Sequence, residues 1–220
     1  MIARRRWLAH FSASLLAGLV AAAWPSPAVA AGKPRPQTIL VVGDSLSAEY
    51  GLQRGSGWVA LLATRLGREH PEATVVNASI SGDTTAGGLA RLPALLRQHA
   101  PTLVVLELGG NDALRGLPLE TSRANLTEMA KLAKAAGARV LILGMQIPPN
   151  YGRSYGERFV AMFDEVARSQ GVALVPFMLK GVADGPQAEQ MFQADRIHPV
   201  ASAHPIILGN VWPVLEPLLR

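Results

Sequence analysis

TILVVGDSLS, residues 38–47, is the stretch that decides the fold class. Its apolar residues, Ile39 to Val42, follow one another without the polar alternation of a strand that has one solvent-exposed face. Such runs are typical of parallel strands that helices cover on both faces. Gly43, Asp44 and Ser45 then supply turn residues. The stretch therefore predicts a buried parallel strand with polar groups at its carboxyl end.

The same apolar pattern recurs along the chain and alternates with helical patterns. This alternation predicts an α/β fold, a three-layer α/β/α sandwich around a parallel sheet. Right-handed crossovers limit the topology, but the residues alone leave the strand order open. Strands are predicted over 38–42, 74–78, 103–108, 139–143 and 172–175, and helices over about 57–69, 86–98, 119–136, 154–170 and 202–218.

The first 30 residues have the composition of an export signal. Arg4 to Arg6 precede an apolar run over 7–23, and Ala28-Val29-Ala30 supplies the small residues of a cleavage site. The run is short for a membrane span, which disfavours an uncleaved anchor. General secretion is expected, with the twin-arginine route as the alternative. We therefore expect a periplasmic or secreted protein with a signal peptide over 1–30, a short flexible lead-in over 31–37 and one further domain over 38–220.

Charge and cysteine content exclude several classes of function. The chain has 21 basic and 16 acidic residues, and the first 30 residues hold three of the basic ones and no acid, which leaves 18 against 16, a net charge of +2. No basic stripe interleaved with aromatics remains, so nucleic-acid binding is not expected. The absence of cysteine excludes disulfides, a thiol nucleophile and a lipid-modified cysteine. We expect a monomer with no stable membrane anchor after cleavage.

Polar residues follow three of the predicted strands. They occupy residues 43–47, 79–83 and 109–112, and a fourth polar block, 195–199, lies near the C-terminus. Ligands of open parallel sheets bind at the carboxyl ends of the strands. We therefore expect the four blocks to converge on one crevice.

The residue types in these blocks suit nucleophilic catalysis. A serine nucleophile needs a base, a group that orients the base, and donors for the oxyanion. Asp195 and His198 are three residues apart, so one turn can set the carboxylate against the imidazole. Ser45 would expose its hydroxyl on a sharp turn, with its own backbone N–H at a helix start. Gly82 would add a second backbone N–H, and Asn111 a side-chain amide.

These blocks resemble the SGNH (GDSL) hydrolase family. Ser45 matches the nucleophile of its GDSL block, Gly82 its glycine, Asn111 the asparagine of its GGND block, and Asp195 with His198 its DxxH block. Further stretches resemble the branch of multifunctional bacterial periplasmic thioesterases, arylesterases and lysophospholipases. The resemblance implies a flavodoxin-like five-stranded parallel sheet in the order 2-1-3-4-5. It also implies an acyl-enzyme intermediate and no cofactor.

Two positions depart from the pattern of that branch. Arg196 stands where the branch usually has glycine, and His204 where glutamine is expected before proline. His204 also opens an alternative, in which it joins Asp195 and His198 as a metal ligand. That alternative leaves the serine, glycine and asparagine blocks unexplained, so we expect no metal.

Neighbouring polar residues have simpler interpretations. Asp44 is predicted to be a turn residue that accepts backbone hydrogen bonds. Glu107, inside an apolar strand, is predicted to be a paired carboxylate at the end of the sheet. Asp83, Thr84 and Thr85 are candidates for the N-cap of the next helix.

The predicted function is hydrolysis of small-molecule acyl esters and thioesters, which include aryl esters and lysophospholipids. Leu114, Leu117 and Tyr151 are expected to border an apolar groove for the acyl chain. One alternative is a carbohydrate acetylesterase with the same triad, but a sugar site favours more exposed aromatics than four Trp, three Tyr and five Phe, 12 in all, provide. Another is a periplasmic small-molecule binding module, which would need no complete triad.

Overall fold

The computed structural model describes residues 36–220, so the predicted signal peptide and most of the predicted lead-in lie outside the described residues. Five parallel strands form one sheet in the order β2-β1-β3-β4-β5. This order and the α/β class confirm the expectation. The strands are β1 (Gln37–Gly43), β2 (Ala73–Asn77), β3 (Leu103–Glu107), β4 (Arg139–Leu143) and β5 (Ala173–Val175).

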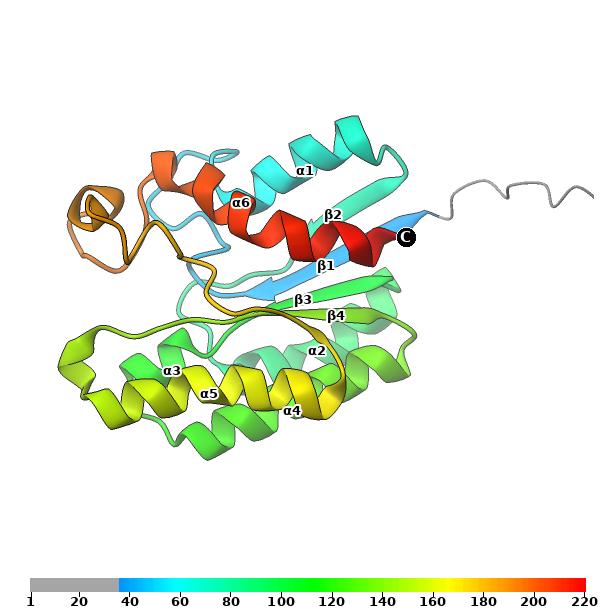
Figure 1. The fold of residues 1–220 in the computed structure, drawn as a ribbon. Helices are drawn as coiled ribbons and strands as arrows, with labels where there is room; N and C mark the ends of the chain where they lie inside the picture. Colours follow the sequence, from blue (N-terminus) through cyan, green and yellow to red (C-terminus); the bar gives the residue numbers. More distant parts are fainter. Residues whose placement is uncertain (1–35) are drawn as a thin grey trace, which may run out of the picture. The chain divides into compact units, whose positions relative to one another are not determined.

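Helices cover both faces of the sheet. α1 and α6 pack on one face, and α2, α4 and α5 on the other (Figure 1). Among residues 36–220, no helix is both long and apolar enough to cross a membrane. The helices are α1 (Trp58–Glu69), α2 (Thr85–His99), α3 (Gly110–Leu114), α4 (Leu119–Ala135), α5 (Arg153–Gln170) and α6 (His204–Leu215), with short 3-10 turns η1 (Pro149–Tyr151), η2 (Ala188–Met191), η3 (Ala201–Ala203) and η4 (Glu216–Leu219).

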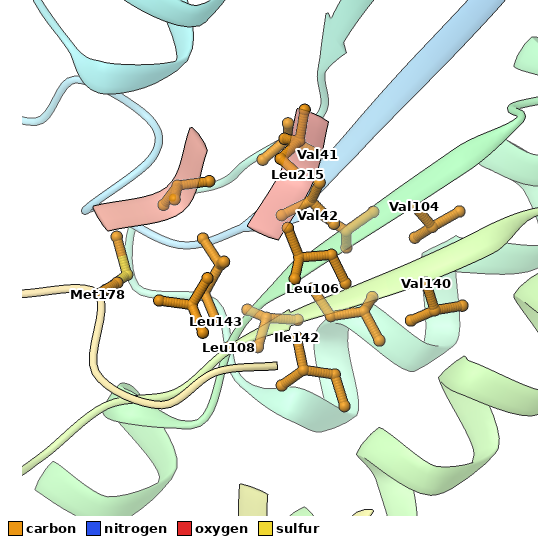
Figure 2. Close-up of a cluster of buried hydrophobic side chains, with 14 of the residues drawn as sticks. Val41, Val42, Val104, Leu106, Leu108, Val140, Ile142, Leu143, Met178 and Leu215 are labelled. Carbon is orange, nitrogen blue, oxygen red and sulfur yellow. The ribbon is translucent and has the colours of Figure 1, made fainter. Parts of the chain in front are cut away.

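The two-sided core explains why the strands are apolar throughout. Residues 39–42 of β1 are fully buried, as are residues 103–106 of β3. Figure 2 shows side chains of β1, β3 and β4 packed beside Leu215 of α6 and Met178. Burial of each such aliphatic side chain contributes about 1.5–3 kcal/mol. An alternating strand would place a polar side chain in one of these two interfaces.

The carboxyl end of β1 requires a glycine. A Cβ at Gly43 would lie 2.7 Å from Oε2 of Glu107 and 2.9 Å from Oγ of Ser47. Gly43 pairs in register with Glu107 of the neighbouring strand β3. Glycine therefore lets a buried carboxyl group and a hydroxyl group pack against the backbone directly below Ser45.

Candidate active site

Ser45 lies on an irregular turn after β1, not at the start of a helix. The N–H groups of Ser47 and Ala48 both donate to the carbonyl of Asp44, but the first helix begins only at Trp58. Glu49 and Gly51 have φ values of 58° and 70°. A right-handed helix cannot continue through these left-handed residues. The expected helix start at Ser45 is therefore wrong.

Ser45, His198 and Asp195 form one hydrogen-bonded chain. Oγ of Ser45 is 2.8 Å from Nε2 of His198, and Nδ1 of His198 is 2.7 Å from Oδ2 of Asp195. The two loops that carry them are 153 residues apart in sequence. The structure thus brings together all three residues that the sequence predicted for the triad.

Hydrogen bonds keep the Asp195 carboxylate ionised. Its Oδ1 accepts the backbone N–H groups of Ile197 and His198, at 2.9 and 3.0 Å. The backbone N–H of His198, then its ring, then the N–H of Ile197 lower the pKa of Asp195 to about 2. Because an ionised carboxylate can only accept, the proton of a neutral imidazole lies on Nδ1. Nε2 then offers its lone pair to the hydroxyl of Ser45.

Two backbone donors beside the serine have no partner in the protein. Within residues 36–220, neither the N–H of Ser45 nor that of Gly82 donates a hydrogen bond to another residue. Gly82 adopts φ +79°, a conformation that favours glycine, and the N–H of Ile80 ties its loop to the carbonyl of Gly43 at 3.0 Å. Ser45 and Gly82 are both half-buried, so their free N–H groups remain available to an oxyanion formed at the nucleophile.

Asn111 is held by the aspartate that precedes the serine. Its Nδ2 donates to Oδ2 of Asp44 at 2.8 Å, which uses one amide hydrogen and leaves the second for another acceptor. Oδ1 of Asp44 also accepts the N–H of Leu46 at 3.0 Å. Asp44 is therefore the turn residue that the sequence predicted. The hydrogen bond that it accepts from Asn111 was not predicted.

A second buried carboxyl group lies directly under this turn. Oε2 of Glu107 accepts the hydroxyl of Ser47 at 2.7 Å and the N–H of Asp44 at 3.2 Å. Burial raises the pKa of Asp44 to about 6, and burial together with Asp44 raises the pKa of Glu107 well above its ordinary value. Glu107 is therefore the paired carboxyl group at the end of the sheet that the sequence predicted, and its partners are a hydroxyl and a backbone amide.

A buried network on the other side fixes the helix that carries Asn111. Asp112 accepts the N–H of Thr85 at 2.9 Å and the hydroxyl groups of Thr85 and Ser122. These bonds tie α3 to α2 and α4. Thr84 is the N-cap of α2, one of the three residues predicted for it, and accepts from the N–H of Gly87.

Tyr50 and Gln193 also shape the site, and neither was predicted from the sequence. The ring centroid of Tyr50 lies 4.3 Å from that of His198. Nε2 of Gln193 donates to the carbonyls of Tyr50 and Pro199, at 3.0 and 3.1 Å. Gln193 thus clamps the serine loop against the histidine loop. Only the position of Tyr50 five residues after Ser45 could have suggested a role.

The residues predicted to border an acyl groove lie together. Oη of Tyr151 donates to the carbonyl of Leu114 at 3.3 Å, so the loops after β3 and β4 are in contact. Leu117 and Tyr151 are 38% and 36% exposed. Two surface hollows, of about 450 and 510 Å³, lie beside α5 and include neither the triad nor these three residues. The predicted groove stays a prediction.

His204 does not join the triad. Its Nδ1 accepts the backbone N–H of Trp58 at 3.0 Å, and the side chain is buried. Burial lowers the pKa of His204, so the ring is neutral at neutral pH. No cluster of three or more potential metal ligands occurs in residues 36–220. The geometry therefore gives no support to a site shared by Asp195, His198 and His204.

Known proteins resemble this chain over most of its length. The GDSL-like Lipase/Acylhydrolase family model matches residues 41–206, which include all four blocks. Esterase TesA of Pseudomonas aeruginosa is 57% identical over 183 residues, 83% of this chain and 90% of the relative. Thioesterase 1/protease 1/lysophospholipase L1 of Escherichia coli K12 is 43% identical over 183 residues, 83% and 85% of the two chains. The crystal structure of esterase EstA from Pseudoalteromonas sp., inhibited by monoethylphosphonate, matches with a TM-score of 0.78 at 39% identity, covering 83% and 98%.

Proposed function

The chain belongs to the GDSL-like lipase/acylhydrolase family, and on that premise we propose that it hydrolyses esters and thioesters through an acyl-enzyme on Ser45. The names of the relatives, an esterase and a thioesterase/lysophospholipase, support this activity. The observation that carries the assignment of residues is the hydrogen-bonded chain from Ser45 through His198 to Asp195. It joins a nucleophile, a base and an orienting carboxylate.

In the acylation step, Oγ of Ser45 attacks the carbonyl carbon of the substrate while Nε2 of His198 takes the hydroxyl proton. The carbonyl oxygen becomes an oxyanion. It accepts the free N–H groups of Ser45 and Gly82 and the second amide hydrogen of Asn111. Asp195 stabilises the imidazolium without taking its proton.

The intermediate then collapses and the acyl–oxygen or acyl–sulfur bond breaks. His198 returns its proton to the departing alcohol or thiol, which leaves the acyl group on Ser45. A water molecule, deprotonated by the same imidazole, attacks the acyl-enzyme and releases the fatty acid. Each proton is taken and returned within the cycle, so the proposed reaction needs no cofactor.

The proposed substrates are medium- to long-chain acyl esters and thioesters. The exposed Leu117 and Tyr151 and the half-buried Leu114 offer a partly apolar border that suits an acyl chain. Each buried CH₂ contributes up to about 0.8 kcal/mol, so kcat/KM should rise about two- to fourfold per carbon until the chain is covered. We also propose that the chain is exported and acts in the periplasm or outside the cell, as its first 30 residues indicate.

A phosphonate probe and an ester series test this proposal. The probe should label Ser45, and mass spectrometry of the digested protein should find the adduct on that peptide. Aryl esters from acetyl to palmitoyl should be cleaved with increasing kcat/KM. A sharp preference for acetyl groups, with activity on acetylated sugars, would establish the carbohydrate esterase instead. A chain that is not labelled would be a binding module.

A further inference from the structure

Large exposed apolar side chains gather at the carboxyl edge of the sheet. Within residues 36–220 there are six such side chains, between 36% and 53% exposed, and five of them lie on the loops around Ser45. These loops lie on the left of Figure 1, the side to which the strand arrows point. The sixth, Val160, lies within α5. The five are Tyr50, Ile80, Leu117, Tyr151 and Ile197, which we call the apolar rim.

Arginines accompany this rim in the sequence. Four of the five rim residues have an exposed arginine within four positions. Within the described part of the chain, none of these four arginines forms a salt bridge. The pairs are Tyr50 with Arg54, Leu117 with Arg115, Tyr151 with Arg153, and Ile197 with Arg196.

Val160 also has an exposed arginine close by in the sequence, but that residue, Arg158, forms a salt bridge with Glu120. Val160 lines the 510 Å³ hollow beside α5, together with the carboxylates of Glu157 and Asp164. The rim therefore differs from Val160 in that the exposed arginines next to it form no salt bridge within residues 36–220, although the acidic residues Glu49 and Asp195 also lie beside rim residues in the sequence. Apolar side chains beside unpaired cations are typical of a surface that docks on anionic lipid headgroups.

Arg196 has a conformation that only glycine adopts without strain. Its φ is +59°, and its N–H closes a turn by donating to the carbonyl of Gln193 at 2.9 Å. A long side chain at such a position is uncommon, and a strained residue that persists suggests a function. Here the strain presents a cation at the tip of the histidine loop, next to the exposed Ile197.

We propose that the apolar rim and its four arginines dock reversibly on an anionic phospholipid bilayer, so that Ser45 faces the lipid from which the acyl substrate comes. This rests on the proposed function, because it makes membrane lipids the source of the substrate. Apolar side chains enter the headgroup region, and the guanidinium groups meet lipid phosphates. A groove for one acyl chain alone would need neither the exposed arginines Arg54 and Arg196 nor an exposed apolar Ile80 on the loop after β2.

Vesicle binding tests the docking independently of catalysis. The chain is purified as the host processes it, and mass spectrometry establishes that residues 1–30 are absent. Vesicles contain ether-linked phosphatidylcholine, alone or with about one third ether-linked phosphatidylglycerol, because ether lipids offer no bond to cleave. The chain should sediment with the anionic vesicles, bind the neutral ones more weakly, and dissociate as salt screens the attraction.

Charge variants identify the docking face. Replacing Arg54 and Arg153 by Ser and Arg196 by Gly should weaken the partition onto anionic vesicles about 100-fold, since each surface cation contributes about fivefold. Arg68→Ser with Arg97→Ser is the matched control, because both arginines are exposed and unpaired near the far ends of α1 and α2. The control should bind within about threefold of the parent. Turnover of a soluble aryl acetate should stay within about twofold in both variants, which shows that they fold.

Apolar variants complete the test. Ile80→Ser should weaken binding to vesicles about three- to tenfold, whereas Val160→Ser should leave it unchanged. Equal binding of both vesicle types at low salt, or equal losses in the rim and control variants, would overturn the proposal. So would a dimer in solution that the rim variants convert to a monomer, because the face would then join two copies. If aryl acetate is not hydrolysed at all, the proposed function fails, and the vesicle result still decides the docking.

Discussion

Asp195, which contacts His198, and Asp44, which precedes Ser45, lie in contrasting environments. The side chain of Asp195 is 36% exposed, and hydrogen bonds from His198 and Ile197 lower its pKa to about 2. Asp44 is 3% exposed, and burial raises its pKa to about 6 although Leu46 and Asn111 donate to it. Near pH 5 the Asp195 side chain is therefore ionised and the Asp44 side chain is mostly protonated, because the first is solvated and the second is buried. Asp195 orients the base His198, and Asp44 holds the oxyanion donor Asn111.

The difference also sets two separate pH ranges for stability. Asp195 binds protons more weakly when folded, so its contribution is present above about pH 3.8 and is lost as the pH falls towards 2. Asp44 binds protons more strongly when folded, so its contribution is present below about pH 3.8 and is lost as the pH rises through about 6. A fall in pH therefore removes the contribution of Asp195 to stability, and a rise in pH removes that of Asp44.

The largest loss of kcat should come from replacing Ser45 or His198, the two triad residues that Asp195 supports. Ser45→Ala and His198→Ala should each lower kcat by about 10⁵-fold or more, and the double variant should lose little more, because the triad acts as a unit. The assay is turnover of an aryl ester, with circular dichroism to verify folding. Ser81→Ala, at an exposed serine on the loop after β2, is the control and should stay near normal. Additive losses from the two replacements would disprove the triad.

Asp195→Asn should lower kcat by about 10³- to 10⁴-fold, less than His198→Ala, because an amide can leave the imidazole in the wrong tautomer while keeping its position. Single-turnover and steady-state measurements with a short aryl ester determine the loss. If Asp195→Asn is nearly fully active, the carboxylate is not the orienting group, and its contrast with Asp44 has no catalytic meaning.

Replacing Asp44 or its partner Asn111 should lower kcat less. Asn111→Ala should lower kcat about 10²- to 10³-fold at nearly constant KM, the usual effect of losing one oxyanion donor. Asp44→Asn should lower kcat about tenfold, because one of the two carboxylate oxygens that accept from Leu46 and Asn111 becomes an NH2 group, which cannot accept. In the Asn111→Ala background, Asp44→Asn should change kcat less than twofold. A full tenfold loss there would show that Asp44 acts by another route.

The smallest effects concern stability. Between about pH 4 and 7 the parent protein should lose up to about 3 kcal/mol of unfolding free energy through Asp44, and Asp44→Asn should reduce that decline. Asp195→Asn should instead reduce the loss below about pH 4. Urea midpoints across this pH range measure both. Identical pH profiles for the two variants would show that the environments do not differ as described.

The sheet could be predicted from the sequence because its strands are runs of apolar residues without polar alternation. Residues 39–42 are apolar on both faces, and only a covered parallel sheet explains that. The first four predicted helices begin and end within one residue of the observed bounds, because each is bounded by turn residues. The helix α3 was missed because five residues are too few for a periodic pattern.

The candidate site was predicted as far as its residues stand in recognisable blocks. Ser45, Asn111 and His198 stand in such blocks, and the structure places Ser45 in hydrogen-bond contact with His198. The clamp of Gln193 on Tyr50 joins positions that no short motif connects, so no local pattern could predict it. The turn at Ser45 was predicted as a helix start because the left-handed backbone of Glu49 leaves no signal in residue type.

The separation of 153 residues between Ser45 and His198 has a consequence for how the activity arises during synthesis. Ser45 follows the first strand, and His198 follows the last, so a growing chain carries its nucleophile long before its base exists. Five strands and their crossovers must be complete before the imidazole can reach the hydroxyl. A nascent or prematurely terminated chain therefore contains a serine no more reactive than any other. Ester hydrolysis by this triad therefore requires a chain that has been synthesised through His198 and folded.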